Sequence, residues 1–227
     1  MQWLEWADVD AAIRKEFGYA IEPDLATARL LQSIVPPQNR LRDLTPELKG
    51  RTDIVIVGCG PGLARADATA VQGKRVVAAD GASSWLREVG LAPHIVVTDL
   101  DGDPDDLVWA SRQGAAMVVH AHGDNPEAIR DLTPLLGKRV YGTYQGPPVP
   151  GLAPLANPGG FTDGDRAVVL VEHLGARQAA LLGFDFDSPP SPYSHKWDPQ
   201  TKPKKLAWAK LIVEGVEERK KLALTRL

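Results

Sequence analysis

The chain has 227 residues, a formal net charge of −3 and a single cysteine, Cys59. This length can bury a full hydrophobic core, and the near-neutral charge offers no field for nucleic acid or for an acidic membrane. One cysteine excludes an internal disulfide, no apolar run reaches the roughly 20 residues of a membrane span, and the charged start lacks a signal-peptide pattern. We therefore expect a cytoplasmic protein with no nucleic-acid or membrane partner.

Residues 1–50 differ in pattern from the rest of the chain. The segments "WADVDAAIRKEF" and "DLATARLLQSIV" carry apolar residues at helical spacing, and the Pro-rich "VPPQNR" follows them. This pattern predicts a small N-terminal helical cap with a linker over residues 1–50. The remaining residues, 51–227, are expected to form the catalytic domain.

From residue 51 onward, short apolar runs alternate with Ala- and Leu-rich stretches. The runs are "DIVIVG", "RVVAAD", "HIVVTD", "AAMVVHA", "RVYGTY" and "AALLGF", and the stretches between them include "GLARADATAVQG" and "DDLVWASRQG". Continuous apolar strands alternating with helices predict an α/β, Rossmann-like fold with a mostly parallel sheet covered by helices on both faces.

The C-terminal segment "KPKKLAWAKLIVEGVEERKKLAL" reads as one long helix packed on the domain. Its helical spacing places Trp208, Leu211, Ile212 and Val216 on one apolar face, opposite Lys and Glu residues. The Pro-rich stretch 191–205 before it is basic and predicts a solvated loop. The alternative is a mobile flap that brings positive charge to phosphates, through Lys196, Lys202, Lys204 and Lys205.

Polar clusters follow five of the predicted strands at their carboxyl ends. They are "GCGPG", "DGASS", "TDLDGD", "HAHGDN" and "GFDFD". In open α/β sheets, ligands bind beyond the carboxyl ends of the strands. Five clusters at one edge of one sheet predict a single large polar site.

The first cluster places Gly58, Gly60, Pro61 and Gly62 at a strand-to-helix turn. Glycines there let backbone N–H groups approach a phosphate, which predicts a nucleotide-binding turn. The dinucleotide pattern G-x-G-x-x-G fails because residue 63 is Leu, and the chain has no P-loop. The same turn resembles the first motif of S-adenosylmethionine-dependent methyltransferases, so that activity is an alternative.

The second cluster contains Asp80, Gly81, Ala82 and Ser83. These residues are candidates for binding nucleotide or substrate, and Asp80 is where a methyltransferase would bind ribose. A turn that starts a helix is the structural alternative.

The third cluster is the sharpest signal, because Asp99, Asp101 and Asp103 alternate directly after an apolar strand. In extended backbone, alternating residues project on one side. Carboxylates in one site cannot all stay ionised without a cation, and hard oxygen ligands suit Mg²⁺. These three residues are therefore the predicted metal-binding and catalytic set. A haloacid-dehalogenase phosphatase loop is an alternative, although Asp103 stands where that motif has Thr.

The fourth cluster sets His120 and His122 near Asp124 and Asn125. An H-x-H pair can bind zinc, but the third histidine of the metallo-β-lactamase pattern is missing, since residue 125 is Asn. We therefore expect these residues to contact phosphate or substrate instead of zinc.

A later stretch, "GFTDGDRAV", starts a predicted helix. Thr162 is suited to the N-cap position, with Asp165 three residues on. Thr162, Asp163 and Asp165 are candidates for a second polar arm that reaches the metal or the substrate. The structural alternative is that the two carboxylates only complement the helix dipole.

In order, the motifs "VIVGCGPGL", "AADGAS", "PHIVVTDLDGD", "HAHGDN", "GFTDGDRAV" and "GFDFD" resemble the archaeal 6-hydroxymethyl-7,8-dihydropterin pyrophosphokinase family. The resemblance covers about residues 53–187 and the Lys-containing start of the last helix. A more distant similarity is to the catalytic domain of thiamine pyrophosphokinase, which has an Ala-Asp-Gly turn, then Pro before a strand that ends in an Asp-rich loop, then a Thr-Asp helix start. The segments "AADGA", "PHIVVTDLDGD" and "FTDGD" of this chain follow that order.

This resemblance implies Mg²⁺-dependent transfer of a diphosphate from ATP to a pterin alcohol, with release of AMP, in tetrahydromethanopterin or folate-type cofactor biosynthesis. It also implies a possible homodimer. In the family pattern, Asp99, Asp101 and Asp103 match the acidic loop, Asp163 and Asp165 the later acidic pair, and residues 120–125 the His-rich loop.

Two other functions remain open at this point. A methyltransferase would account for "GCGPG" but not for the acidic third strand end or for "HAHGDN". A non-catalytic module would bind Mg-nucleotide without turning it over.

Overall fold

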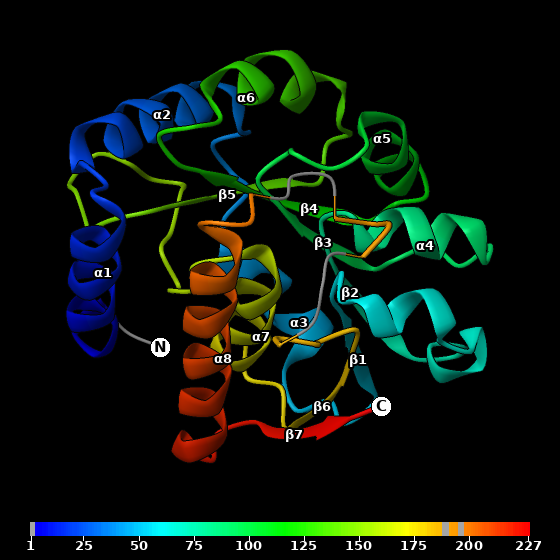
Figure 1. Ribbon diagram of the computed structural model, residues 1–227. Helices are drawn as coiled ribbons and strands as arrows, with labels where there is room; N and C mark the ends of the chain where they lie inside the picture. The colour runs from blue at the N-terminus through cyan, green and yellow to red at the C-terminus, as the bar shows by residue number, and fades with distance from the viewer. Residues whose placement is uncertain (1–2, 188–190, 195–197) are drawn as a thin grey trace.

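The computed structural model describes residues 3–187, 191–194 and 198–227. It shows an α/β fold in which one seven-stranded sheet lies between two layers of helices (Figure 1). All neighbouring strands are parallel, in the order β5-β4-β3-β2-β1-β6-β7. The strands are β1 (Ile54–Val57), β2 (Arg75–Ala79), β3 (Ile95–Thr98), β4 (Ala116–Ala121), β5 (Val140–Tyr144), β6 (Gln178–Leu182) and β7 (Ala223–Arg226). The predicted fold class is therefore confirmed.

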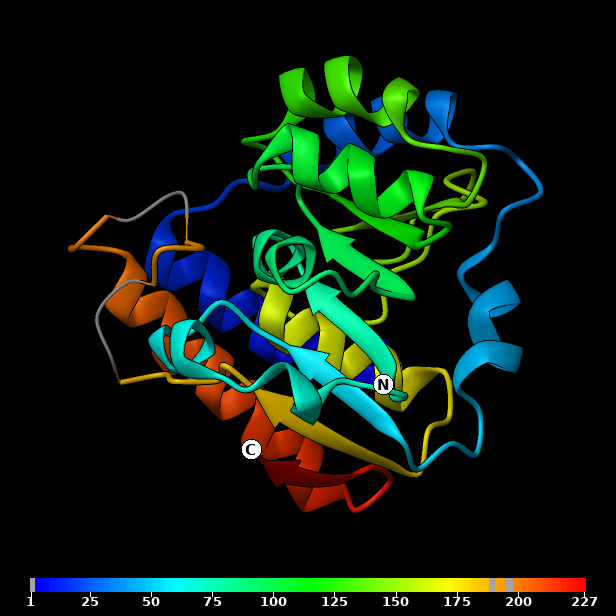
Figure 2. The same ribbon diagram turned by 90° about the vertical axis from the view of Figure 1, so that its right-hand side faces the viewer.

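Burial explains why the strands read as uninterrupted apolar runs. Every residue of β1, β3, β4 and β5 is buried, because helices cover both faces of the sheet. One layer consists of α2 (Ile21–Ile34), α4 (Ala82–Glu88), α5 (Pro104–Arg112) and α6 (Pro126–Leu132). The other consists of α1 (Trp3–Phe17), α3 (Thr45–Leu48), α7 (Asp163–His173) and α8 (Lys202–Arg219) (Figure 2).

The two N-terminal helices lie on opposite faces of the sheet. Trp6 and Ile13 of α1 pack with α7 and α8, whereas Ala28 and Leu31 of α2 pack with α6 over the β4 and β5 edge. The chain then crosses through the 3₁₀ turn η1 (Leu41–Leu44) to α3. Among the described residues, no helix combines the length and apolarity needed to cross a bilayer.

One predicted helix, "GLARADATAVQG", is not an α-helix. The chain between β1 and β2 forms two 3₁₀ turns, η2 (Pro61–Arg65) and η3 (Ala68–Ala70). Asp67 accepts a hydrogen bond from the Thr69 amide at 2.9 Å, which starts a second turn and breaks the segment. The short η4 (Thr133–Leu135) similarly extends α6.

The C-terminal helix ends earlier than its sequence pattern predicts. Lys220 has a left-handed φ of 54°, which closes α8 after Arg219, and the last residues form β7 beside β6. Its buried face is made by Ala209, Ile212, Val213 and Val216. Leu211, predicted on that face, is 57% exposed.

Candidate functional site

A cavity of about 830 Å³ opens over the carboxyl ends of the strands. Its floor follows the sheet from β5 to β6, and α1, α2 and the start of α8 form its walls. Most of the predicted site residues line it, namely Gly58, Gly60, Pro61, Asp80, Asp99, Asp101, His120, His122, Asp124, Asn125, Thr162, Asp163 and Asp165. The single polar site expected from the strand-end clusters is therefore present.

Four carboxylates meet at the centre of this cavity. One oxygen from each of Asp80, Asp99, Asp101 and Asp163 lies within 4.8 Å of the others. They come from the ends of β2 and β3 and from the first residue of α7. All four donors are carboxylate oxygens, a set that suits Mg²⁺ far better than zinc, and the group contains neither histidine.

The pKa values of these carboxyl groups shift in opposite directions. Burial, followed by the negative charges of Asp99 and Asp101, raises the pKa of Asp80 well above its usual range. Burial and the neighbouring carboxylates raise the pKa of Asp163 in the same way. Burial also pushes the pKa of Asp99 upward, but hydrogen bonding and charge interaction with His122 outweigh it, so that this pKa falls to about 2. A bound cation would relieve the repulsion that raises the first two values.

Two residues around the carboxylate cluster have a left-handed backbone conformation. Asp80 has φ of 38° and Leu100 has φ of 68°, an uncommon conformation for residues with side chains. Thr98 compensates, because its hydroxyl donates to Asp80 Oδ1 at 2.5 Å and accepts from the Leu100 amide at 2.7 Å. Gly102 is required beside them, since a Cβ there would lie 2.5 Å from Asp80 Oδ2. Strain of this kind concentrates at functional sites.

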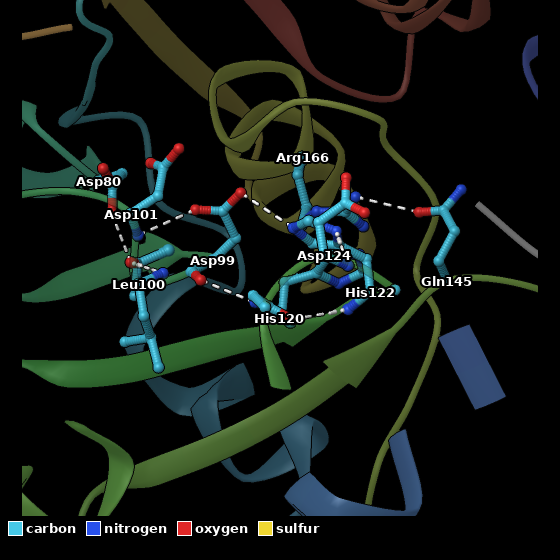
Figure 3. Close-up of polar contacts among 12 residues, drawn as sticks. Asp80, Asp99, Leu100, Asp101, His120, His122, Asp124, Gln145 and Arg166 are labelled. Carbon is cyan, nitrogen blue, oxygen red and sulfur yellow. Dashed lines mark hydrogen bonds and ion pairs between the residues drawn. The ribbon is translucent and has the colours of Figure 1, made fainter. Parts of the chain in front are cut away.

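The His-rich loop supports the acidic loop directly (Figure 3). His122 Nε2 lies 3.1 Å from Asp99 Oδ2. The Asn125 amide donates to the backbone oxygens of Asp99 at 2.7 Å and of His120 at 2.8 Å, and its own oxygen accepts from the His122 amide at 3.0 Å. Asp124 lines the cavity from this loop. The loop thus fixes the position and the charge state of Asp99.

Two of the predicted acidic residues act as helix caps. Asp103 is the N-cap of α5, and its side chain accepts from the amides of Asp105 at 2.8 Å and Asp106 at 3.4 Å. It neither belongs to the carboxylate group nor lines the cavity. Asp165 reaches the cavity wall, but its oxygens accept from Phe161 N, Thr162 N and Thr162 Oγ1 in a capping box.

The glycine turn differs from the phosphate-binding turn that its sequence predicts. The amides of Gly58, Gly60 and Gly62 donate to Leu182 O, Gly183 O and Asp185 Oδ2 at 2.8 to 3.0 Å. A Cβ on Gly60 would lie 2.5 Å from Asp185 Oδ2. These glycines permit close packing of the β1 and β6 ends, and their amides are already paired. Pro61 then begins a 3₁₀ turn instead of an α-helix.

The residues after Asp80 lie behind the cavity surface. Gly81 is the N-cap of α4, and Ala82 and Ser83 are its first residues. None of the three lines the cavity, and neither does Gly62. A Cβ on Gly81 would lie 2.1 Å from Tyr193 O. Ser83 is buried, and its hydroxyl has no hydrogen-bond partner among the described residues.

Sequence reasoning missed the wall contributed by the N-terminal helices. Arg14 of α1 contacts Asp10 at 2.8 Å and Asp24 of α2 at 2.7 Å. Asp24 Oδ1 also accepts from the Gly123 amide at 2.6 Å, which ties α2 to the His-rich loop. Helical periodicity gives no signal for such long-range contacts.

Gln145 and Arg166, which sequence reasoning also missed, extend the hydrogen-bond network of Asp10 toward the sheet. Gln145 donates to Asp10 Oδ1 at 2.8 Å and accepts from Arg166 Nη2 at 3.2 Å. Arg166 is almost fully buried, and burial lowers the pKa of its guanidinium. Its position three residues after Asp163 was the only signal available in the sequence.

Lysines line the cavity near the start of α8. Lys202 and Lys205 are both on its surface, and Lys205 Nζ lies 5.9 Å from the centre of the Phe161 ring. Neither forms an ion pair within the described part of the chain. Lys204 is exposed, and Lys196 lies outside the described residues. Lys202 and Lys205 therefore support the alternative in which this basic stretch brings positive charge to the site.

Known proteins are similar to this chain over most of its length. 6-Hydroxymethyl-7,8-dihydropterin pyrophosphokinase of Pyrococcus furiosus is 42% identical over 229 residues, covering 96% of this chain and 95% of the relative. The protein of the same name from Methanothermobacter thermautotrophicus is 38% identical over 195 residues, covering 85% of this chain and 81% of the relative. A solved structure, the MAf glycosyltransferase from Magnetospirillum magneticum AMB-1, has 17% identity and a TM-score of 0.43, covering 76% of this chain and 29% of that chain.

The match to a protein family spans most of the site. The family described as 6-hydroxymethylpterin diphosphokinase MptE-like matches residues 28–190, which include all four clustered carboxylates and the His-rich loop. Taken with the near full-length relatives, this match shows that the chain belongs to the MptE-like 6-hydroxymethylpterin diphosphokinase family.

Proposed function

We propose that this protein transfers a diphosphate from ATP to the hydroxymethyl group of 6-hydroxymethyl-7,8-dihydropterin, releasing AMP, in methanopterin-type cofactor biosynthesis. The single observation that carries the proposal is the four-carboxylate cluster at the sheet edge of a chain that belongs to this family. Two relatives at 42% and 38% identity bear the name of this activity.

The carboxylates fit the metal that this chemistry needs. Asp80, Asp99, Asp101 and Asp163 would hold Mg²⁺, which when bound neutralises phosphate charge and orients the β-phosphorus. His122 keeps Asp99 ionised and fixes its direction. This assignment replaces Asp103 of the predicted metal set with Asp80 and Asp163.

The reaction requires no nucleophile from the protein. The substrate hydroxyl oxygen bonds to the β-phosphorus, and the bond from that phosphorus to the α–β bridging oxygen breaks. AMP leaves with the bridging oxygen, and the hydroxyl proton passes to solvent. Lys202 and Lys205 supply positive charge to the phosphates, a role that a P-loop lysine would otherwise have. Because the amides of the glycine turn are paired within the protein, we assign phosphate binding to these lysines and to the metal.

Product analysis tests the proposal. The protein is incubated with Mg-ATP and 6-hydroxymethyl-7,8-dihydropterin, and nucleotides and pterins are resolved by chromatography. We expect one AMP and one pterin diphosphate for each ATP consumed. Formation of ADP, or of free phosphate without a pterin diphosphate, would refute the assignment. Unchanged ATP, with methyl transfer from S-adenosylmethionine, would favour the methyltransferase alternative.

We also propose that the protein forms a homodimer, as its resemblance to the family implies. The long helix α8 exposes Leu211, an apolar side chain that a partner subunit could cover. Light scattering at micromolar concentration should give twice the mass of the 24.5 kDa chain. A monomer mass would contradict this part of the proposal.

A further inference from the structure

His120 is a buried histidine whose ring has one unused nitrogen. It is 3% exposed and lines the cavity at the end of β4. Its Nδ1 lies 3.0 Å from Thr143 Oγ1, and the Thr143 hydroxyl donates to Val119 O at 3.3 Å. With that hydroxyl hydrogen directed at Val119 O, the proton between the two side chains is the one on His120 Nδ1. The remaining nitrogen, Nε2, then carries a lone pair and meets no group at hydrogen-bond distance and angle among the described residues, although the Gln145 side chain lies near the ring.

The surroundings keep this imidazole neutral. Burial, followed by the positive charges of Arg166 and His122, lowers the pKa of His120 well below its usual range, although the Gln145 amide opposes the shift. A neutral ring with a bare nitrogen repels phosphate oxygens, because both atoms are acceptors. The partner of His120 Nε2 must therefore be an N–H or O–H donor, which a ligand can supply by displacing water.

The cavity wall near His120 suits an uncharged ring. Tyr19 and Phe161 line the cavity, and Phe17 packs against both, with ring centres 5.4 and 5.3 Å away. Phe161 is connected to the β5 end through Arg166, whose Nη2 donates both to Phe161 O at 3.3 Å and to Gln145 at 3.2 Å. The charge of Arg14 is balanced by Asp10 and Asp24. This end of the cavity offers aromatic surface and one free acceptor, with Lys205 at its edge beside the Phe161 ring.

The order of the strands places the two substrates on opposite sides of the carboxylates. Gln145 and His120 follow β5 and β4, the acidic loops follow β3 and β2, and Gly58 and Phe184 follow β1 and β6. The ends of β4 and β1 are three strand spacings apart, about 14 Å. In-line attack at the β-phosphorus requires the acceptor alcohol and the departing AMP to lie on opposite sides of that atom.

The lysine that distinguishes the two ends is Lys202. Its positive charge acts on Cys59, in the turn after β1, so it lies toward the β1 end of the cavity. The anionic nucleotide is favoured at this end, where cationic side chains have no paired carboxylate among the described residues. The uncharged ring is favoured at the other.

We propose that the pterin ring binds over the ends of β4 and β5, beneath α1 and α2, and donates a ring N–H or amino hydrogen to His120 Nε2. This inference rests on the proposed function and names the residue that selects the acceptor ring. His122, two residues away, holds Asp99 and belongs to the metal side of the site. The two histidines of the H-x-H pattern therefore serve different substrates.

The test compares two variants at opposite ends of the cavity. Affinities are measured by calorimetry for 6-hydroxymethyl-7,8-dihydropterin and for Mg-α,β-methylene-ATP, which cannot be cleaved at the α–β bridge. The variant His120→Leu should weaken pterin binding at least about tenfold, the usual effect of a lost buried hydrogen bond, and leave nucleotide affinity within about twofold. The variant Lys202→Gln should do the reverse. If His120→Leu weakens the nucleotide and spares the pterin, adenine occupies this end and the inference is wrong.

A measurement on the unmodified protein covers the case in which a variant does not fold. Nitrogen-15 NMR of His120 should show a protonated Nδ1 and a bare Nε2, with the Nε2 resonance shifting when pterin is added and not when nucleotide is added. A protonated Nε2 would overturn the inference. If the unmodified protein forms pterin diphosphate but His120→Leu binds pterin normally, only this inference fails. If the unmodified protein neither binds nor converts the pterin, the proposed function fails with it.

Discussion

The loop after β3 and the start of α7 use the same residue type for two different tasks. In the first, Asp99 and Asp101 join the carboxylate cluster and Asp103 caps α5. In the second, Asp163 joins the cluster and Asp165 completes the capping box of α7 with Thr162. In both segments a metal-facing aspartate is followed two residues later by a helix cap. The cap fixes the helix start, and thereby holds the preceding carboxylate at the sheet edge.

The largest expected effect separates these tasks in the β3 loop. The change Asp101→Asn removes a carboxylate from the cluster and should lower turnover at saturating Mg²⁺ at least about 100-fold, equivalent to about 2.7 kcal/mol. The matched change Asp103→Asn keeps a good N-cap and should leave turnover within about threefold. Steady-state rates of AMP formation measure both. Equal losses in the two variants would show that Asp103 also serves the metal.

A stability comparison sharpens the second task. Asp165 is fully buried and accepts three hydrogen bonds, so Asp165→Asn leaves a donor unpaired and should cost about 1 to 3 kcal/mol of unfolding free energy. The cap at Asp103 is only partly buried, and Asp103→Asn should cost less than about 0.5 kcal/mol. Urea unfolding of the metal-free proteins measures the difference. A stable Asp165→Asn protein with lost activity would instead make Asp165 part of the reaction site.

Metal affinity should depend on pH because the clustered carboxylates carry raised pKa values. Burial and neighbouring negative charges raise the pKa of Asp80 and of Asp163, so both hold protons above the usual range for aspartate. Mg²⁺ must displace those protons, and its affinity should rise with pH by up to about tenfold per unit for each proton displaced. Calorimetry in buffers of different ionisation enthalpy also counts the protons released. An affinity that is flat from about pH 5 to 8 would contradict the raised values.

The smallest expected effect concerns stability without metal. A carboxyl group whose folded pKa is raised stabilises the protein at low pH, and this contribution is lost as pH rises through the folded pKa. The Asp80→Asn variant has no carboxyl group to ionise at this position, so it does not lose stability in this way as pH rises. Its Tm without metal should therefore be about 2 to 4 °C higher than that of the unmodified protein near neutral pH. It should also abolish the Tm increase that Mg²⁺ gives to the unmodified protein. Scanning calorimetry with and without Mg²⁺ decides, and an unchanged Mg²⁺ response would exclude Asp80 from the metal site.

The fold was predictable where burial dominates the sequence pattern. Six apolar runs gave six strands, and the carboxyl-end rule brought together residues as distant as Asp80 and Asp163. The seventh strand, Ala223–Arg226, was not predicted because it is an edge strand with mostly exposed residues and lacks an apolar run. The helix predicted after β1 also failed, since a local Asx turn at Asp67 competes with helical hydrogen bonds.

The sequence could not predict which residues of the site face the cavity centre and which only support the fold. Asp101 and Asp103 occupy equivalent positions in an alternating pattern, and the chain departs from that pattern at Leu100, where φ is 68°. The sequence of the glycine turn predicts a phosphate-binding loop, but in the structure Gly183 and Asp185 accept its amide hydrogens. Arg14 contributes through tertiary packing alone, for which a single sequence carries no periodic signal.

The central claim is that the carboxylate cluster directs transfer of the β- and γ-phosphates together. ATP labelled at the α- or at the γ-phosphate is incubated with Mg²⁺ and 6-hydroxymethyl-7,8-dihydropterin, using the unmodified protein, Asp101→Asn and Asp103→Asn. The γ label should appear only in pterin diphosphate and the α label only in AMP, with both products lost in Asp101→Asn and retained in Asp103→Asn. A γ label in a pterin monophosphate or in free phosphate, or full activity of Asp101→Asn, would contradict the claim.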